Sequence, residues 1–132
     1  MLAVARILLL DDSALVLNAT REALEPSGHQ LTCVSEPAAF FTALSTEKPE
    51  LALVDVSMPT LEGDAVVWIA RAHQLHGCRI VLYSAKTEAE LTALVRSSGA
   101  DGFICKTGDD VKLRQEIDVV LARSPKGGNS PG

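Results

Sequence analysis

The sequence lacks an excess of basic residues. It has 12 Lys and Arg against 17 Asp and Glu among 132 residues, which gives a net charge of −5 at pH 7. Proteins that bind nucleic acid through its phosphates need clusters of Lys and Arg. The acidic balance therefore argues against a nucleic-acid-binding surface and favours a cytoplasmic protein that meets protein partners or small anions.

Cysteine is scarce as well. Cys33, Cys78 and Cys105 are odd in number and widely spaced, so they predict neither a disulfide framework nor a Cys-x-x-Cys metal motif. A reducing compartment is the expected location. We interpret Cys105, which precedes Lys106, as a strand residue rather than as a thiol activated by the neighbouring lysine.

Long apolar runs are missing too. No run approaches the roughly 20 residues that a membrane-spanning helix needs, so we expect no membrane partner. The apolar start of the chain is interrupted by Arg6 and followed at once by Asp11 and Asp12. With no small-residue cleavage site in view, Ile7–Leu10 is interpreted as a strand and not as part of a signal peptide.

Short apolar runs alternate with amphipathic segments along the chain. The five predicted strands are Arg6–Leu10, His29–Val34, Leu51–Asp55, Arg79–Tyr83 and Gly102–Cys105. The five predicted helices are Ala14–Glu25, Glu36–Ser45, Asp64–Leu75, Glu88–Ser98 and Asp109–Arg123. This alternation predicts a doubly wound α/β fold, with a parallel sheet between two layers of helices. We expect one domain over residues 1–123 and a flexible tail, rich in Gly, Pro and Ser, over residues 124–132.

Polar side chains stand where four of these strands end. The first strand is followed by Asp11 and Asp12, the third ends in Asp55, the fourth is followed by Ser84 and the fifth by Lys106. Sites in open parallel sheets form at the carboxyl ends of the strands. The sequence therefore predicts that three carboxylates, one hydroxyl and one ammonium converge at one edge of the sheet.

Such a cluster has a specific chemistry. Three close carboxylates repel one another and call for a cation, and an all-oxygen site suits Mg²⁺ better than zinc. A carboxylate beside a divalent cation can attack phosphorus and form an aspartyl phosphate, which makes Asp55 the candidate nucleophile. The metal and Lys106 would stabilise charge on the transferring phosphoryl group, and Ser84 could bond one of its oxygens.

The sequence resembles the receiver domains of bacterial two-component response regulators, from about Arg6 to Arg123. The motifs that carry the resemblance are Asp11-Asp12-Ser13, LALVDVSMP at 51–59 with Gly63 downstream, Ser84-Ala85, and GADGFICK at 99–106. The resemblance implies a flavodoxin-like sheet with strand order 2-1-3-4-5. It also implies that Asp55 is the phosphoacceptor.

The resemblance implies further roles around Asp55. Asp12 would bind Mg²⁺ directly, Asp11 mainly through water, and the backbone carbonyl of Ser57 would complete the protein ligands. Lys106 would pair with Asp55 or its phosphate, and Ser84 would move towards the phosphoryl group.

Three other positions follow from the resemblance. Phe103 occupies the place of an aromatic switch residue that turns inward on activation. Ser57 and Lys86 occupy the two variable positions that tune the lifetime of the phosphate. Thr107 stands where the family usually has Pro after the lysine, so we expect a trans peptide bond there.

The resemblance implies a histidine kinase or phosphotransfer protein as phosphodonor. Because no further domain follows Arg123 in this sequence, we expect a stand-alone receiver whose output is contact with a downstream protein. A homodimer is a further expectation. Trp68 falls towards the polar face of its predicted helix, where it is either a partner contact or packed flat against a neighbouring element.

Two other function classes stay open from the residues. One is a receiver-like binding module that is never phosphorylated. The other is a phosphatase of the haloacid-dehalogenase type, although its Asp-x-Asp motif after the first strand is replaced here by the adjacent pair Asp11-Asp12. Our expectation is not an enzyme that turns over, but a protein that accepts a phosphoryl group on Asp55 and dephosphorylates itself.

Overall fold

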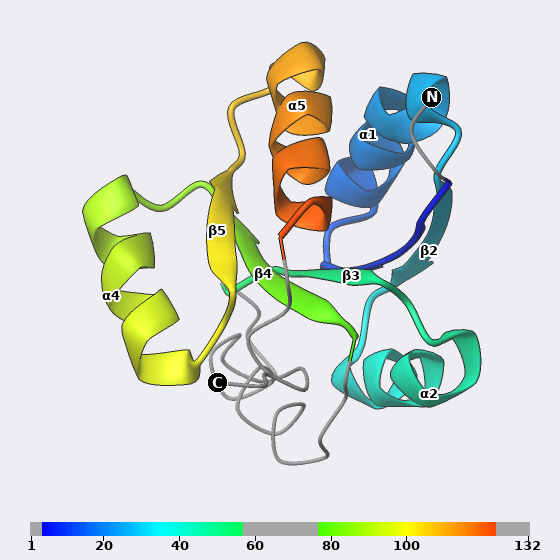
Figure 1. Ribbon diagram of the computed structural model, residues 1–132, viewed down its shortest axis with the longest axis horizontal. Helices are drawn as coiled ribbons and strands as arrows, with labels where there is room; N and C mark the ends of the chain where they lie inside the picture. Colours follow the sequence, from blue (N-terminus) through cyan, green and yellow to red (C-terminus); the bar gives the residue numbers. More distant parts are fainter. Residues whose placement is uncertain (1–3, 57–76, 124–132) are drawn as a thin grey trace.

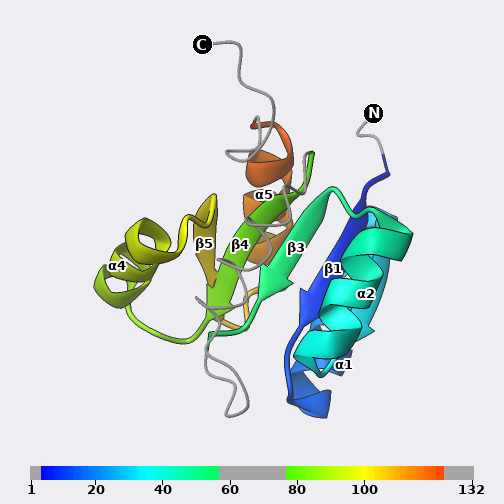
Figure 2. The same cartoon turned by 90° about the horizontal axis from the view of Figure 1, so that it is seen from below.

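The computed structural model of the protein describes residues 4–56 and 77–123. Five strands form one parallel sheet in the order β2-β1-β3-β4-β5, so the predicted sheet and its strand order are confirmed. Figure 2 shows the arrows of β1, β3, β4 and β5 pointing the same way, and β2 pairs with β1 in parallel. The strands are β1 (Arg6–Leu10), β2 (Gln30–Val34), β3 (Leu51–Val54), β4 (Arg79–Ser84) and β5 (Gly102–Cys105).

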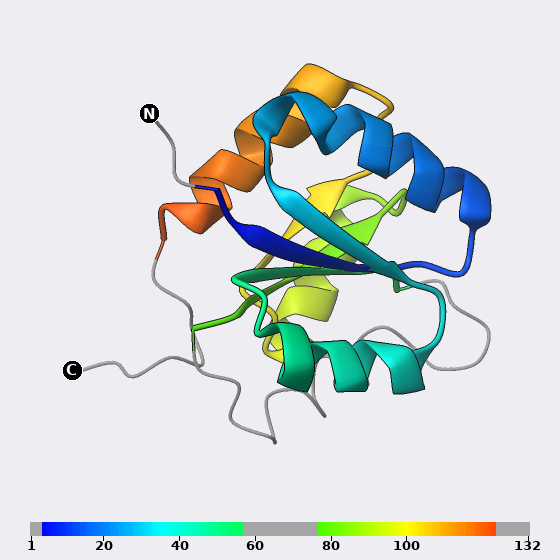
Figure 3. The same cartoon turned by 90° about the vertical axis from the view of Figure 1, so that its right-hand side faces the viewer.

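Helices cover both faces of this sheet. Helices α1 (Ala14–Leu24) and α5 (Asp110–Leu121) lie on one face, and α2 (Pro37–Glu47) and α4 (Glu88–Ser98) lie on the other (Figure 1, Figure 3). The doubly wound architecture is thus confirmed, while the helix expected at 64–75 lies outside the described residues. Within the two described ranges, no helix has both the length and the apolar character that crossing a bilayer requires.

The alternation of side chains along each strand divides the core into two layers. On β4, for example, Ile80 and Leu82 belong to the layer beneath α2 and α4, while Val81 and Tyr83 belong to the layer beneath α1 and α5. Strands that are apolar on both faces are what a sheet covered on both sides requires.

Helix ends follow the capping chemistry of the sequence. The Ser13 hydroxyl accepts a hydrogen bond from the Val16 amide at the start of α1, and Thr87 forms a capping box with Glu90 at the start of α4. Gly99 ends α4 in the left-handed conformation (φ 83°), which glycine adopts without steric cost.

The ends of three helices differ from the prediction, and α5 runs over Asp110–Leu121 instead of Asp109–Arg123, with Asp109 as its N-cap. Helix α2 continues two residues beyond Ser45, and the Thr46 hydroxyl donates to the Thr42 carbonyl on its exposed side. The polar residues there lie on the solvent face of the helix and not in a loop. Helix α1 ends at Leu24, and a 3-10 turn over Glu25–Ser27 follows it because Pro26 has no N–H to continue the α-helical bonding.

Candidate functional site

The three predicted acids meet at the carboxyl edge of the sheet. Asp11 and Asp12 follow β1 and Asp55 follows β3, and an oxygen from each lies within 4.8 Å of the others. Asp11 is 1% exposed and Asp55 is 4% exposed, whereas Asp12 is open to solvent. Two nearly buried carboxylates and an accessible one therefore share one small site.

Backbone hydrogen bonds fix where these side chains start. The Asp11 amide donates to the Val34 carbonyl of β2 at 3.1 Å, and the Asp55 amide donates to the Leu10 carbonyl of β1 at 2.9 Å. On the other side, the Lys106 amide donates to the Ser84 carbonyl of β4 at 2.8 Å. The sheet pairing thus continues one residue past each strand, and it holds the site residues on a rigid scaffold.

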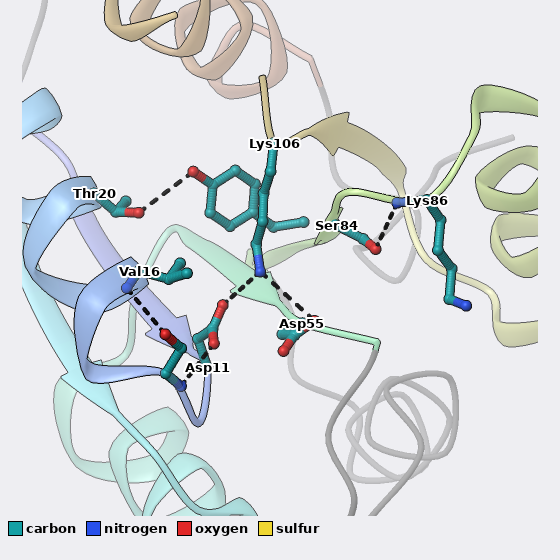
Figure 4. Close-up of polar contacts among 9 residues, drawn as sticks. Asp11, Val16, Thr20, Asp55, Ser84, Lys86 and Lys106 are labelled. Atoms are coloured by element: carbon teal, nitrogen blue, oxygen red, sulfur yellow. Dashed lines mark hydrogen bonds and ion pairs between the residues drawn. The ribbon is translucent and has the colours of Figure 1, made fainter. Parts of the chain in front are cut away.

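Lys106 supplies the positive charge of the site. Its Nζ lies 2.6 Å from Asp11 Oδ2 and 3.7 Å from Asp55 Oδ1, and its side chain is 20% exposed. Figure 4 shows this side chain extending from the end of β5 to a point between Asp11 and Asp55. The resemblance implies that Lys106 pairs with Asp55 or its phosphate; the ammonium lies within ion-pair distance of both Asp55 and Asp11, and its contact with Asp11 is the shorter one.

Asp11 is held at both of its oxygens. Oδ1 accepts the Ser13 amide at 2.9 Å, and Oδ2 accepts the Lys106 ammonium. A carboxylate that already accepts two hydrogen bonds is better suited to outer-sphere than to direct metal contact. Among the hydrogen bonds of the described residues, none occupies the oxygens of the accessible Asp12 carboxylate in this way.

The donor set of this site fits a hard divalent cation. All three side chains offer carboxylate oxygens, and the three carboxylates together with the Lys106 ammonium carry a formal charge of −2. Mg²⁺ takes oxygen ligands and keeps several waters, which an open carboxylate such as Asp12 allows. The backbone carbonyl of Ser57, predicted as a further ligand, lies outside the described residues.

Ser84 and Lys86 lie on the far side of Lys106 from Asp11 (Figure 4). Ser84 is 1% exposed and is the last residue of β4, one residue beyond the predicted strand end. Its hydroxyl accepts the Lys86 amide at 3.1 Å, which closes a tight turn after β4. The Lys86 ammonium lies 3.9 Å from the Glu90 carboxylate of α4, so it is anchored to that helix.

The remaining predicted positions lie around this centre. Phe103 on β5 is half-buried against the core layer beneath α2 and α4. The peptide bond between Lys106 and Thr107 is trans, as expected. Burial raises the pKa of the Cys105 thiol, with the Glu88 and Glu116 carboxylates adding to that rise, so Cys105 is not an activated thiol.

Sequence reasoning missed two residues that adjoin the site. The Lys106 ammonium lies 5.2 Å from the centre of the Tyr83 ring, and the Tyr83 hydroxyl lies 3.3 Å from the Thr20 hydroxyl of α1. A groove of about 170 Å³ runs beside them, between α1 and the loop that follows β5. The sequence held one signal for Tyr83. It ends the predicted strand and directly precedes Ser84, so the two side chains must point to opposite faces of the sheet beside the site.

Known proteins are similar to this chain in sequence and in fold. The response regulator receiver domain family matches residues 7–118. The chain is 27% identical over 117 residues to the transcriptional regulatory protein CseB of Streptomyces coelicolor, covering 89% of this chain and 49% of that protein. It is 29% identical over 119 residues to the DNA-binding response regulator MtrA of Mycobacterium tuberculosis H37Rv, covering 90% of this chain and 51% of that protein.

The chain thus spans about half the length of the curated relatives it matches. Among solved structures, the chemotaxis response regulator CheY4 of Vibrio cholerae superposes with a TM-score of 0.81 at 19% identity, covering 89% of this chain and 99% of that one. At that identity the superposition supports the fold alone. Together with the family match over most of its length, it means that the chain belongs to the response regulator receiver domain family.

Proposed function

We propose that this receiver domain accepts a phosphoryl group on Asp55 from a histidine kinase or a phosphotransfer protein, and that it signals by contact with a downstream protein. One observation carries the proposal. A carboxylate that is only 4% exposed lies beside two further acids and 3.7 Å from a lysine ammonium. Crowding buried like charges is costly for a fold, so the cluster is best explained by the chemistry it performs.

Asp11, Asp12 and Asp55 would hold Mg²⁺, with the backbone carbonyl of Ser57 as a further ligand. Bound there, the ion supplies positive charge that stabilises the phosphoryl oxygens in the transition state. Asp12 is the accessible member of the set and is the first contact for the ion, whereas Asp11, hydrogen-bonded at both oxygens, acts mainly through water.

In the proposed step, one Asp55 oxygen forms a bond to phosphorus as the phosphorus–nitrogen bond of the donor phosphohistidine breaks. The electron pair of that bond stays on the donor nitrogen, which takes up a proton from solvent. The Lys106 ammonium would stabilise the negative charge of the transferred phosphoryl group, since it already lies within ion-pair distance of Asp55. The Ser84 hydroxyl accepts the Lys86 amide, and its own hydrogen serves as a donor to a phosphoryl oxygen.

Phosphorylation would signal by changing the surface of the domain. Movement of Ser84 towards the phosphoryl group and an inward turn of Phe103 would alter the face formed by α4, β5 and α5. Because Phe103 has no hydroxyl, packing alone would report its rotamer. Ser57 and Lys86 would tune how long the phosphate lasts, and Trp68 remains a candidate contact for a partner or for a second copy in a homodimer.

The proposed domain spans residues 1–123 and acts in the cytoplasm, and the tail expected over 124–132 lies outside the described residues. The relatives include proteins named for DNA binding, but this chain spans about half their length. Its net charge of −5 supports a domain that itself contacts neither nucleic acid nor membrane.

The direct test is incubation with acetyl phosphate and Mg²⁺, followed by intact mass measurement. The expected result is a mass increase of one phosphoryl group that is lost in Asp55→Asn and when the metal is chelated. Asp110→Asn, an exposed carboxylate in the first turn of α5, is the matched control and keeps the adduct. Absence of an adduct on the wild type would favour the unphosphorylated binding module, and multiple turnovers of the donor would favour the phosphatase.

A further inference from the structure

Tyr83 lies between the proposed phosphorylation site and helix α1. It is 7% exposed and sits on the face of β4 that α1 and α5 cover, while the next residue, Ser84, belongs to the site itself. Among the described residues, the layer in which Tyr83 lies is built from aliphatic side chains such as Val81 and Ile117. A tyrosine there places an aromatic face and a hydroxyl in an otherwise apolar layer.

The hydroxyl of Tyr83 has a buried partner. It lies 3.3 Å from the hydroxyl of Thr20, which is 3% exposed on α1. Buried hydroxyls cost stability unless they are hydrogen-bonded, so the two groups satisfy each other. This contact joins the far end of the ring to α1.

The ring itself supports the lysine of the site. Nζ of Lys106 lies 5.2 Å from the ring centre, within the range of a cation–π interaction. The same ammonium contacts Asp11 at 2.6 Å and Asp55 at 3.7 Å. Tyr83 and the two carboxylates therefore constrain Lys106 together.

Lysine needs such support more than most side chains. Its flexible four-carbon stem loses rotamer entropy when the ammonium is held at one place. Here the stem leaves the chain just before Thr107 and Gly108, in an exposed loop whose glycine has a φ of 79°. A ring packed in the buried layer beneath α1 and α5 restricts the stem without adding a competing charge.

We propose that Tyr83 is a positioning residue that acts through Lys106: its ring keeps the ammonium between Asp11 and Asp55 and so speeds phosphoryl transfer to Asp55. The proposal rests on the proposed function of the site. The ring carries the kinetic effect, and the hydroxyl contact with Thr20 contributes to stability. Phe at position 83 should therefore preserve the rate, whereas aliphatic residues should not.

The test measures the phosphorylation rate at a series of acetyl phosphate concentrations, which separates the maximal rate from the half-saturating concentration. Tyr83→Leu should lower the maximal rate about fivefold, the size of a modest cation–π contribution, with little change in half-saturation. Tyr83→Met, whose flexible thioether fills similar space, should do the same and provides a second variant should Leu prevent folding. Tyr83→Phe should stay within about twofold of the wild type.

Two further variants separate positioning from loss of packing. Val81→Ala opens space in the same strand and layer without touching Lys106, so it should lower the melting temperature and leave the rate unchanged. In a Lys106→Ala background, Tyr83→Leu should change the rate less than about twofold, because the residue through which it acts is gone. A full fivefold loss in that background, or a wild-type rate in Tyr83→Leu, overturns the proposal.

A readout without phosphoryl transfer keeps the two proposals distinct. In nuclear magnetic resonance spectra without Mg²⁺, the Lys106 ε-methylene should be ordered in the wild type and in Tyr83→Phe. It should become as mobile as that of the exposed Lys112 in Tyr83→Leu. If the wild type forms no adduct, the proposed function fails; if the order of Lys106 does not depend on the ring, the positioning role of Tyr83 fails.

Discussion

The Lys106 ammonium forms its shorter ion pair with Asp11 and not with Asp55. Nζ lies 2.6 Å from Asp11 Oδ2 and 3.7 Å from Asp55 Oδ1, although 95 residues separate Lys106 from Asp11 in the sequence. One carboxylate oxygen of Asp11 is thereby committed to a protein cation. The lysine and a metal ion thus compete for the negative charge of the same three acids.

This competition predicts the effect of Lys106→Met on Mg²⁺ affinity. Removing the ammonium frees Asp11 and leaves a more negative cluster, so Mg²⁺ should bind about tenfold more tightly, as measured by titration calorimetry. Lys112→Met removes the same charge from the α5 surface, where Lys112 pairs with Glu116, and should change the affinity little. Weaker Mg²⁺ binding in Lys106→Met would contradict the pairing described here.

The crowding of the acids predicts that one of them destabilises the metal-free protein. Asp12→Asn removes one of three carboxylates that lie within 4.8 Å of one another. The free energy of unfolding in urea without Mg²⁺ should therefore rise by about 0.5–1 kcal/mol, because the repulsion is relieved. Glu22→Gln, an exposed charge on α1, should change it little and is the matched control.

Adding Mg²⁺ should make the wild type more stable than Asp12→Asn. The wild type gains stability from the bound ion in proportion to the logarithm of the Mg²⁺ concentration over its dissociation constant, whereas Asp12→Asn gains less. An equal gain in both proteins would mean that Asp12 is not a ligand.

The buried His29, at the opposite end of the sheet, predicts a further effect on stability. Its Nδ1 accepts the Ala5 amide at 2.9 Å, and its Nε2 lies 3.6 Å from Asp118 Oδ1, with the imidazole only 3% exposed. His29→Phe leaves the Ala5 amide without its acceptor and should lower the free energy of unfolding by about 1–3 kcal/mol. His29→Asn, whose Oδ1 can replace Nδ1 as acceptor, should recover part of that loss, and an equal loss in both variants would show that packing alone matters.

The capping box of α4 predicts a dependence on pH. Hydrogen bonds from the Thr87 hydroxyl and amide lower the pKa of the Glu90 carboxyl below its ordinary value of 4.5, and the Lys86 ammonium contributes to that lowering. A folded-state pKa below the unfolded one adds stability above the unfolded value, and this stability is lost as the pH falls through the folded value. The wild type should therefore exceed Glu90→Gln in stability near neutral pH, and the difference should shrink in acid.

Urea unfolding of both proteins from about pH 7 to about pH 3 measures this difference. Glu88→Gln changes a charge on the same first turn that takes no part in the capping box, so it isolates the effect of the Thr87 hydrogen bonds. A stability difference between wild type and Glu90→Gln that stays constant over the whole range would contradict the assignment.

Several features of this protein follow from local sequence. The runs at Arg6–Leu10 and Leu51–Val54 are apolar on both faces, which requires a sheet covered on both sides. The helix starts at Ser13 and Thr87 can be predicted from the sequence, because an N-cap needs a side-chain oxygen directly before the first helical residue. Acids that directly follow parallel strands must share one edge of the sheet, so the meeting of Asp11, Asp12 and Asp55 was predictable.

Only the tertiary structure decided which groups touch within that edge. The family resemblance implies pairing of Lys106 with Asp55 or its phosphate; in the structure its ammonium lies over the Tyr83 ring and contacts both Asp55 and, more closely, Asp11. The contact of Tyr83 with Thr20 depends on which face of β4 turns towards α1, and the contact of His29 with Asp118 depends on how α5 packs back across the sheet. Strand periodicity and capping act over a few residues and can be read in order along the chain. Distances between side chains dozens of residues apart depend on packing, which exists only once the whole core has formed.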